Sequence, residues 1–536
     1  MIRPPALTLL ATVLAVAPLA AQLPPVKEHT LSNGMRVLIV ERHDEPTVAC
    51  SWVARVGSVN ERPGITGLAH LFEHMMFKGT KTIGTRNAAR DAELNAAQDR
   101  IQAQIREELA QLRLRQRRGE LVHFQDPKVR TPRLQELMAQ FDALVKEQRG
   151  LVVKDEIWTL YAGAGGTGMN ASTSQDRTNY IVSIPSNKLE FWCWLESDRL
   201  ANPVFREFYS ERNVILEERK QTLESRPGGL VDEAFNAMVW MGHPYHWQVI
   251  GWPSDISQVT REQAAEFFAT YYAPNNLTAI LVGDVKAAEA LPMLERYFGR
   301  IPANPKGVPD VITEDPAQPA EQRMVAEVET SPSVQVVFKT VPAVHRDGPA
   351  LSALASVLSG SGGGMMGMRG GGGGRASGRL AKALVLGQQA ATSAMAFSRG
   401  QKYGGTFVLR ATPAPGKRPE EVEPLLYAEL AKVAKEGITD AELERVKNAY
   451  QMGLYARLDS NVGIRETLTA AEATGSWRDL EIGVRAMMAV TKEDVQRVAA
   501  AYFSKENRSV LITQRKGAAA PRRPHRGSQI QTPEVK

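Results

Sequence analysis

Two histidines and a glutamate lie within five positions of an otherwise apolar run, GLAHLFEHMMFKGT, at residues 67–80. On a helix, His70 and His74 are one turn apart on one face, with Glu73 beside them. Two imidazoles in this arrangement can hold one metal ion while the carboxylate reaches a water on it, in the inverse order of the better-known His-Glu-x-x-His motif. The pattern alone also arises by chance in large proteomes, so a metal site and ordinary polar helix positions are both open readings.

A catalytic zinc ion commonly takes three protein ligands and a water, so we expect a further acidic or imidazole ligand elsewhere in the chain. The segment YSERNVILEERKQTLES, residues 209–225, supplies candidates. Glu211 and Glu218 are two turns apart on the predicted helix and share a face, and Val214 and Ile215 between them can bury it. For either glutamate taken alone, a solvated acidic face is the alternative reading.

The chain that must position these residues is long enough, at 536 residues, for two or more hydrophobic cores. Of its formal net charge of +6, Arg3 contributes +1 and residues 515–536 contribute +5. Residues 22–514 are therefore electrically balanced, which gives no support to a nucleic-acid groove. Residues 515–536 are rich in Pro, Gly and Ala and are expected to be a disordered basic tail.

The N-terminus has the pattern of an export signal, because Arg3 precedes an apolar run and small residues follow at 20–21. The run is too short to span a bilayer, so we predict a cleaved signal peptide at residues 1–21 and a periplasmic or secreted protein with no stable membrane span. An uncleaved anchor is the alternative. Cys50 and Cys193 lack zinc-site spacing and are expected to be buried small hydrophobes.

An internal repeat divides the chain. The stretches VTREQAAEFFATYYAPNNLTAILV (259–282) and VTKEDVQRVAAAYFSKENRSVLIT (490–513) align without a gap, and each predicts a threonine-capped helix, a turn with an asparagine and a strand. We therefore expect an α+β fold of two homologous halves, each a mixed, mostly antiparallel sheet packed with helices. The halves are residues 22–300 and 323–514, and a Pro-rich linker joins them at 301–322.

Three segments fall outside this repeat pattern. Asn33-Gly34 favours a tight hairpin turn near the N-terminus. Residues 90–150 have no counterpart in the second half and carry apolar stripes at helical spacing, which predicts an inserted helical hairpin; we favour a solvated arm over a partner-docking arm. The Gly-rich segment 359–378 lacks both a GxGxxG motif and a phosphate-loop ending, so we expect a mobile loop.

Five segments together resemble the pitrilysin family of zinc peptidases, which includes insulin-degrading enzyme and the mitochondrial processing peptidase. They occur in the family's order, within a resemblance over most of residues 27–514, and read GSVNERPGITGLAHLFEHMMFKGT, GMNASTSQDRTNY, ERNVILEE, HPYHWQVIGWPSDI and YYAPNNLTAILVGD. The resemblance implies a secreted metalloendopeptidase with one Zn²⁺ per chain. Its zinc ligands would be His70, His74 and Glu218, with Glu73 as general base.

The resemblance also implies roles for residues around the metal. Glu211 would orient a ligand histidine. Asn170, Ala171 and Ser172 would lie on a strand edge that pairs with the backbone of a substrate, so extended or unfolded peptides are the expected substrates.

The chain departs from the family in its second half. The family completes its site with an arginine and a tyrosine, and ungapped matching places Val385 and Thr392 there. The segment ALSALASVLSG, which should echo the metal helix, has no ligand residues. We therefore expect a zinc-bearing subunit that works with a homologous partner subunit lacking zinc, or as a homodimer. A non-catalytic assembly or binding subunit of the same family is the alternative.

Overall fold

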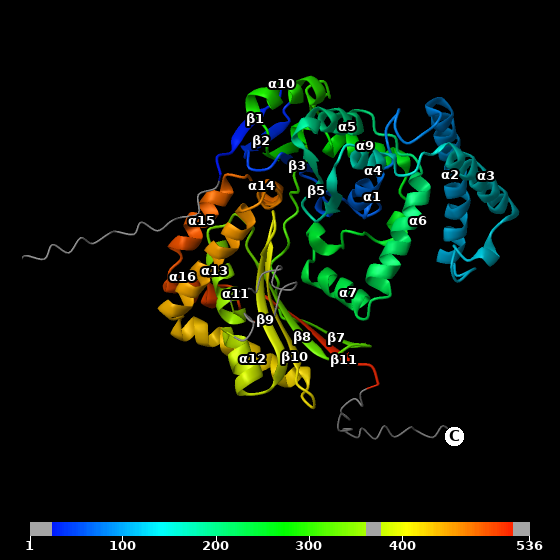
Figure 1. Cartoon of the computed structure of the whole chain (residues 1–536). Helices are drawn as coiled ribbons and strands as arrows, with labels where there is room; N and C mark the ends of the chain where they lie inside the picture. Colours follow the sequence, from blue (N-terminus) through cyan, green and yellow to red (C-terminus); the bar gives the residue numbers. More distant parts are fainter. Residues whose placement is uncertain (1–23, 361–376, 518–536) are drawn as a thin grey trace, which may run out of the picture.

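The computed structural model describes residues 24–360 and 377–517. It contains two β-sheets that lie one above the other in the view of Figure 1, each with its own set of helices. The predicted signal peptide, most of the Gly-rich segment and most of the basic tail lie outside the described residues.

The first sheet has six strands in the order β1-β2-β6-β3-β5-β4, and β4 is one of its two edges. β2 and β6 are parallel, and all other neighbours are antiparallel. The predicted hairpin joins β1 to β2, and Gly34 in its turn has a φ of +85°, a conformation that glycine adopts without strain. The strands are β1 (Lys27–Thr30), β2 (Arg36–Glu41), β3 (Thr47–Ala54), β4 (Thr167–Thr173), β5 (Thr178–Pro185) and β6 (Leu277–Gly283).

The second sheet has five strands in the order β7-β11-β8-β10-β9, with β7 and β11 parallel and the rest antiparallel. This order repeats β2-β6-β3-β5-β4 of the first sheet strand for strand. The predicted α+β fold of two homologous halves is therefore confirmed. The strands are β7 (Gln322–Val328), β8 (Ser333–Thr340), β9 (Ala391–Gly400), β10 (Gly405–Pro413) and β11 (Arg508–Arg515).

The repeated sequence has the same local structure in both halves. Helix α9 (Arg261–Tyr271) precedes β6 and α16 (Lys492–Ala501) precedes β11, and each begins with a threonine whose side chain closes a capping box. After each helix an asparagine bonds the carbonyl oxygen of a tyrosine at 2.8 Å, Asn276 to Tyr271 and Asn507 to Tyr502. The matched sequence positions thus do matched work at the two turns.

The other helices cover the outer faces of the sheets. Helix α11 occupies the place of α1 in the second half and carries no histidine, cysteine, aspartate or glutamate. In the first half the helices are α1 (Leu68–Met75), α4 (Glu156–Gly163), α5 (Leu189–Ala201), α6 (Phe208–Arg219), α8 (Pro253–Ile256) and α10 (Ala287–Phe298). In the second half they are α11 (Gly348–Ser359), α12 (Pro419–Glu436), α13 (Asp440–Leu458) and α15 (Asp479–Ala489).

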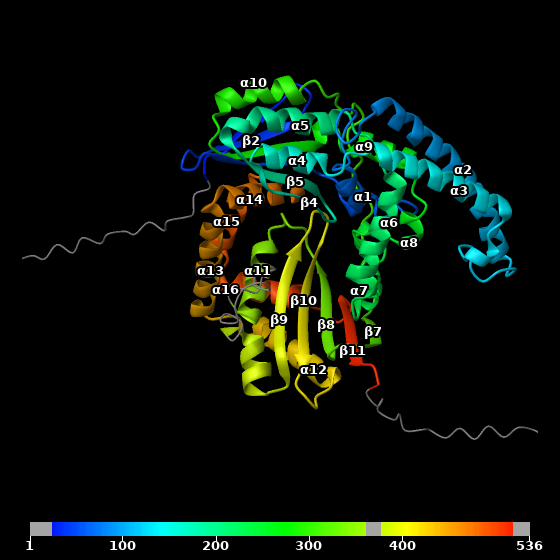
Figure 2. The same ribbon diagram turned by 45° about the vertical axis from the view of Figure 1, so that its right-hand side comes forward.

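The two halves each contribute one helix to the other's sheet. Helix α7 (Gly229–Val239) of the first half packs Phe235 in one cluster with Val337 of the second sheet. Helix α14 (Asn461–Thr474) of the second half packs Ile464 with Ile280 of the first sheet. Figures 1 and 2 show α14 between the sheets and α7 beside β7 and β11 of the second sheet. Apolar residues of both halves therefore share each of these two clusters, and their burial holds the halves together.

A buried ion-pair cluster reinforces this exchange. Glu472 of α14 is completely buried and accepts hydrogen bonds from Arg36 at 2.7 Å and Arg55 at 2.6 Å, both in the first half. Buried charges need such partners, because an unpaired carboxylate in this position would lose its hydration without compensation.

The predicted helical hairpin is present in the first half. It consists of α2 (Ala88–Arg117), the 3-10 turn η2 (Pro127–Val129) and α3 (Pro132–Leu151), and it projects away from both sheets in Figure 2. The two helices bury Ile105, Leu112, Leu134 and Leu137 against each other. The hairpin is therefore a small satellite core of its own on an arm.

The segment between the halves is extended but fixed in place. Asp315 accepts hydrogen bonds from the backbone N–H groups of Gly242 and His243 and from Lys339 Nζ at 2.6 Å. The second sheet begins at Gln322 and ends at Arg515, one residue outside the predicted span at each end. Cys50 and Cys193 are both free and buried.

No helix in residues 24–360 or 377–517 combines the length and apolar character needed to cross a membrane.

Candidate metal centre

Helix α1 sorts the motif residues onto two sides. Its apolar side chains Leu68, Leu71, Phe72 and Met75 are buried in the hydrophobic core formed by the first sheet and its helices. His70, Glu73 and His74 are only partly buried; the two histidines face Glu218 of α6, and Glu73 faces Thr173 at the end of β4. The 3.6-residue period of the helix alone produces this separation.

The N-terminus of α1 is anchored by a buried carboxylate and by two closely packed glycines. Glu61 accepts hydrogen bonds from the N–H groups of Gly67 at 2.9 Å and Ala69 at 2.7 Å, which have no partner within the helix. Burial raises the pKa of Glu61 well above its ordinary value. A Cβ on Gly251 would lie 2.4 Å from the nitrogen of Gly67, and both glycines have positive φ. Only glycine fits here, which accounts for Gly251 in the HPYHWQVIGWPSDI segment.

Helix α6 carries the third candidate ligand, Glu218, one residue before its end. Arg219 fixes this end, because its guanidinium bonds both oxygens of Glu233 at 2.8 and 2.7 Å and the carbonyl oxygen of Gly251 at 2.8 Å. Arg219 and Glu233 are both buried. The anchor of α1 and the anchor of α6 therefore meet at Gly251, which sets the two helices in register.

The three predicted ligands come together. One ligand atom from each of His70, His74 and Glu218 lies within 4.8 Å of the others. His70 Nε2 is 3.7 Å from Glu218 Oε1, and His74 Nε2 is 3.5 Å from Glu218 Oε2. These separations are too long for hydrogen bonds. They match the roughly 3.3 Å between ligand atoms that sit about 2 Å from a tetrahedral zinc ion, so the donor set fits such an ion.

The protonation of His70 also suits a ligand. Burial lowers the pKa of His70 to about 4, with a further contribution from the charge of His74. The ring is therefore neutral at pH 7 and has a free lone pair to offer.

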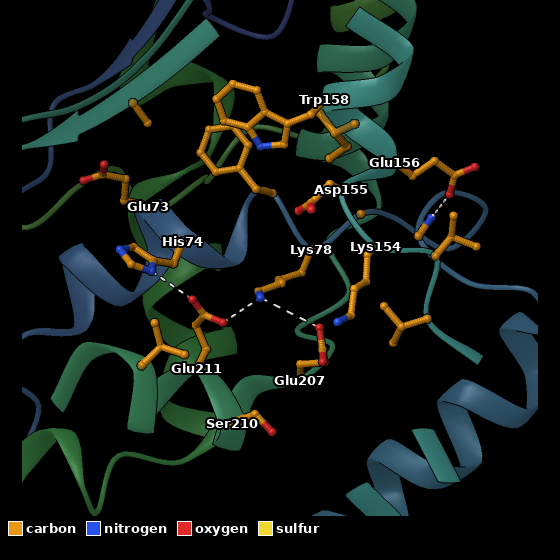
Figure 3. Close-up of a pocket in the computed structure, with 18 of the residues that line it drawn as sticks. Glu73, His74, Lys78, Lys154, Asp155, Glu156, Trp158, Glu207, Ser210 and Glu211 are labelled. Atoms are coloured by element: carbon orange, nitrogen blue, oxygen red, sulfur yellow. Dashed lines mark hydrogen bonds and ion pairs between the residues drawn. The ribbon is translucent and has the colours of Figure 1, made fainter. Parts of the chain in front are cut away.

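His74 is oriented by a carboxylate that is itself held by a lysine, as Figure 3 shows. His74 Nδ1 lies 2.9 Å from Glu211 Oε1, so donation of that N–H leaves Nε2 free for a metal. Lys78 Nζ lies 2.6 Å from the other oxygen of Glu211. The structure thus brings Glu211 against His74, one of the three candidate ligands.

The electrostatics of this chain of contacts favour charged groups. Burial alone would lower the pKa of His74, but the bond to Glu211 and the nearby carboxylates outweigh it and raise that pKa. Burial alone would likewise raise the pKa of Glu211, but the bonds to His74 and Lys78 hold it below its ordinary value. Glu211 is therefore ionised at pH 7.

Glu73 occupies a position of its own. Its Oε2 accepts a hydrogen bond from Thr173 Oγ1 at 2.7 Å, at the end of the edge strand β4. Burial raises the pKa of Glu73, and the bond from Thr173 moderates the rise. A carboxylate with a raised pKa is a better proton acceptor near neutral pH than an ordinary one.

A cavity of about 1190 Å³ opens beside these groups. Its walls are α6, the end of α1 and the segment from the end of α3 into α4, and Figure 3 shows charged side chains on opposite walls. Glu73, His74, Glu218, Asn170 and Ala171 all line it. The cavity is large enough for several residues of a peptide.

The predicted substrate-pairing residues lie on β4. Asn170, Ala171 and Ser172 pair with β5 on one side only, and the other edge of β4 has no strand neighbour among the described residues. The side chains of Asn170 and Ser172 are exposed. An open strand edge of this kind offers backbone N–H and C=O groups to an extended peptide.

Val385 and Thr392 lie in the second half. Val385 is in the π-helical segment η9 (Ala381–Gly387) and packs against the second core, whereas Thr392 is exposed on β9. Neither side chain can donate charge-assisted hydrogen bonds as an arginine would.

Two residues of the site escaped the sequence reasoning. Lys78 and Thr173 both lie inside segments that were singled out, but each is at a point where the element ends. Helical spacing does not predict the position of Lys78, because this residue follows the end of α1. Strand alternation does not predict that Thr173 of β4 contacts Glu73 of α1. A cation four residues after His74 was the available signal for Lys78.

Replacing Lys78 with methionine is expected to weaken zinc binding about tenfold, and Lys78→Arg should restore most of the loss. Without the ammonium group Glu211 loses a strong hydrogen bond and no longer fixes the His74 ring. This loss is small for a residue that supports a metal ligand, because removing the Lys78 cation also removes its electrostatic repulsion with the zinc ion. Competition with a chromophoric zinc chelator measures the affinity.

Lys154→Met is the matched control for this experiment. Lys154 lines the same cavity, and no carboxylate of the described residues lies within ion-pair distance of its ammonium group. Equal zinc affinities for the two methionine variants would show that the contact with Glu211 does not position His74.

Comparison with known proteins gives a consistent pattern. The family model described as Insulinase (Peptidase family M16) matches residues 36–113, and the model described as Peptidase M16 inactive domain matches residues 258–450. The zinc protease PqqE of Helicobacter pylori is 24% identical over 496 residues, which cover 91% of this chain and 93% of that protein. A probable mitochondrial-processing peptidase subunit beta of Arabidopsis thaliana is 23% identical over 488 residues, covering 90% and 76%.

A solved protease structure from Helicobacter pylori superposes with a TM-score of 0.72 at 22% identity, over 92% of this chain and all of that one. This similarity concerns the fold of the whole two-half unit.

Proposed function

Because this chain belongs to the M16 (insulinase) family of zinc metallopeptidases, we propose that it is an exported zinc endopeptidase acting on extended or unfolded peptides. We further propose that it is the zinc-bearing subunit of a two-subunit enzyme. The observation that carries the proposal is the convergence of His70, His74 and Glu218 within 4.8 Å, with Glu73 beside them on α1.

His70, His74 and Glu218 would hold one zinc ion, which when bound lowers the pKa of a water and polarises a peptide carbonyl. Glu73 takes a proton from the attacking water. The water oxygen bonds to the carbonyl carbon, and the C–N bond breaks as Glu73 returns the proton to the departing nitrogen. Thr173 holds the carboxylate of Glu73 on the β4 side, where the peptide would lie.

The open edge of β4 supports the proposed substrate class. A peptide that adds to this edge alongside Asn170, Ala171 and Ser172 lies beside Glu73 through Thr173 on the same strand. Recognition through main-chain hydrogen bonds requires an extended backbone and reads little of the side chains. A folded protein cannot present such a strand without unfolding locally.

The second half supports the two-subunit proposal. Val385 and Thr392 stand where the family resemblance leads one to expect an arginine and a tyrosine, and neither side chain carries a charge. A homologous partner, or a second copy, would have to supply these donors. Export is supported by the sequence of residues 1–21.

A non-catalytic assembly subunit is the second candidate function. The match to the inactive-domain model over residues 258–450 favours it. That match, however, covers none of His70, Glu73, His74 and Glu218. A scaffold has no use for Glu73 hydrogen-bonded beside a complete ligand set, so we favour the enzyme.

Cleavage of a quenched, unstructured peptide by the protein lacking residues 1–21 tests the proposal. We expect one zinc per chain, cleavage that a chelator abolishes and zinc restores, and no cleavage of a stably folded protein of the same composition. A peptide with one N-methylated backbone amide in the paired region should show a KM raised about tenfold, since it loses one main-chain hydrogen bond of about 1 kcal/mol and gains a clash. Bound zinc without cleavage would indicate a missing partner subunit, and absence of bound metal would favour the scaffold.

A further inference from the structure

The far end of the helical hairpin is strongly basic. We define the arm tip as residues 113–133, which run from the last turns of α2 through η2 to the start of α3. It has seven basic residues against Glu120 and Asp126, a net charge of +5. The basic residues are Arg113, Arg115, Arg117, Arg118, Lys128, Arg130 and Arg133.

Three of these seven charges are paired within the chain, and one of the three is Arg133, which lies 2.9 Å from Glu136. Arg115 and Arg118 share the single carboxylate of Glu120, at 3.2 and 3.9 Å. Among the described residues, no carboxylate lies within 4 Å of the charged side-chain groups of Arg117, Lys128 and Arg130. The arm tip therefore presents an uncompensated positive field.

Exposed apolar side chains lie among these charges. Val122 in the turn is 96% exposed and Leu114 on α2 is 40% exposed. Arg113 stacks over the ring of Phe124, 4.7 Å from its centroid, and the same ring packs against the apolar cluster of the arm. Val122 is therefore held out in solvent and is not part of the apolar cluster that the two helices of the arm bury.

The arm separates this charge from the rest of the molecule. Helix α2 has 30 residues, which corresponds to about 45 Å of length. Figures 1 and 2 both show the far end of the hairpin away from the two sheets. Since residues 22–514 are neutral as a whole, the remainder of that span carries −5 against the +5 of the arm tip. Within residues 22–514 the charge is thus divided between a projecting positive end and a negative body, and residues 515–536 add a further +5.

We propose that the arm tip docks this protein onto anionic phospholipid bilayers, with arginines on the lipid phosphates and Val122 among the headgroups. Arginine bonds phosphate oxygens in pairs, and each cation near an anionic surface strengthens binding. Residues 22–514 outside the arm tip carry −5 and are repelled by an anionic surface, so this part of the protein, with the metal centre, is held away from it.

A flat bilayer fits the arm tip better than an acidic protein does. The tip is the narrow, convex end of two helices and a turn, and a stable protein interface needs about 800 Å² from each partner. A bilayer requires only charge and a few inserted apolar groups.

The test is partition of the protein lacking residues 1–21 onto vesicles, one set of phosphatidylglycerol and phosphatidylcholine and one of phosphatidylcholine alone. We expect binding to the anionic vesicles only, weakening as salt is raised. Arg117→Glu with Arg118→Glu should reduce the partition constant roughly 30-fold, because each cation contributes a factor of about five. The control Arg485→Glu with Lys505→Glu makes the same change in charge on exposed positions of the body and should bind as the unmodified protein does.

A second variant reports whether the turn itself enters the headgroup region. Val122→Cys can be labelled selectively with an environment-sensitive dye, since Cys50 and Cys193 are buried. The dye emission should shift to shorter wavelength on anionic vesicles and not with polyglutamate.

Three outcomes would overturn the proposal. One is equal binding by the arm-tip and control variants. Another is loss of binding on neutralising Arg522, Arg523 and Arg526 with no effect of the arm-tip variant, since residues 515–536 also carry +5. The third is binding to polyglutamate without binding to vesicles, which would make the arm tip a site for an acidic protein.

Discussion

Glu73→Gln is expected to lower kcat for peptide cleavage about a thousandfold while the protein keeps one zinc per chain. Glutamine has the shape of glutamate and can still accept the hydrogen bond from Thr173, so the local structure should persist. It cannot accept a proton from water at neutral pH, and a positioned general base commonly contributes 10²- to 10⁴-fold. Zinc content should be unchanged because Glu73 is not one of the three converging ligands.

The measurement combines metal analysis with cleavage of the quenched peptide. The protein is assayed alone or with its partner subunit, whichever form cleaves the peptide. Glu289→Gln on α10 makes the same substitution at an exposed position in an i,i+3 pair with Lys286 and should be neutral. Activity of Glu73→Gln within a few-fold of the unmodified enzyme would remove Glu73 from the mechanism. Loss of zinc together with activity would instead make Glu73 part of the metal site.

Helical spacing predicted which residues of each helix share a face, and the family resemblance chose His70, His74 and Glu218 among them as the candidate ligands. Helical spacing alone puts His70 and His74 on one face, and the same rule puts Glu211 and Glu218 on one face of α6. The two segments are far apart in sequence, so their meeting follows from the sheet that carries both helices and from the packing at Gly251. Sequence alone signalled that meeting only through the family resemblance.

Features that depend on tertiary contacts were less accessible. The repeat predicted two similar halves, but it carried no sign that α7 and α14 would each cover the opposite sheet. Their apolar faces look the same whichever sheet they bury. Lys78 and Thr173 were missed for a related reason, since Lys78 lies beyond the end of α1, Thr173 is the last residue of β4, and each acts through a contact with another element.

Glu218→Gln is expected to weaken zinc binding by more than a hundredfold, because it replaces a charged ligand with a neutral amide. This loss exceeds the roughly 10- to 100-fold that is typical when a residue hydrogen-bonded to a metal ligand is replaced. Bound zinc stabilises the folded protein in proportion to the logarithm of its affinity. At fixed free zinc in excess, a hundredfold loss removes about 2.7 kcal/mol from the zinc-dependent part of the free energy of unfolding.

Without metal the same substitution should have the opposite effect. The carboxylate of Glu218 then lies near that of Glu73 with no ion between them, and its charge contributes to the raised pKa of Glu73. Removing that charge relieves the repulsion, so in a chelator Glu218→Gln should be at least as stable as the unmodified protein. Unfolding curves of both proteins are measured with chelator and with zinc. The variant should be the less stable of the two proteins in zinc and at least as stable as the unmodified protein in chelator.

Glu217→Gln is the matched control, one position earlier on α6 with a side chain 65% exposed. It should match the unmodified protein in both conditions. If Glu218→Gln is destabilising in chelator as well, Glu218 holds α6 in place by its contacts, and the case for a ligand fails on that measurement. If the variant keeps full zinc affinity, the third ligand is another group, and Glu211, already against His74, is the one within reach.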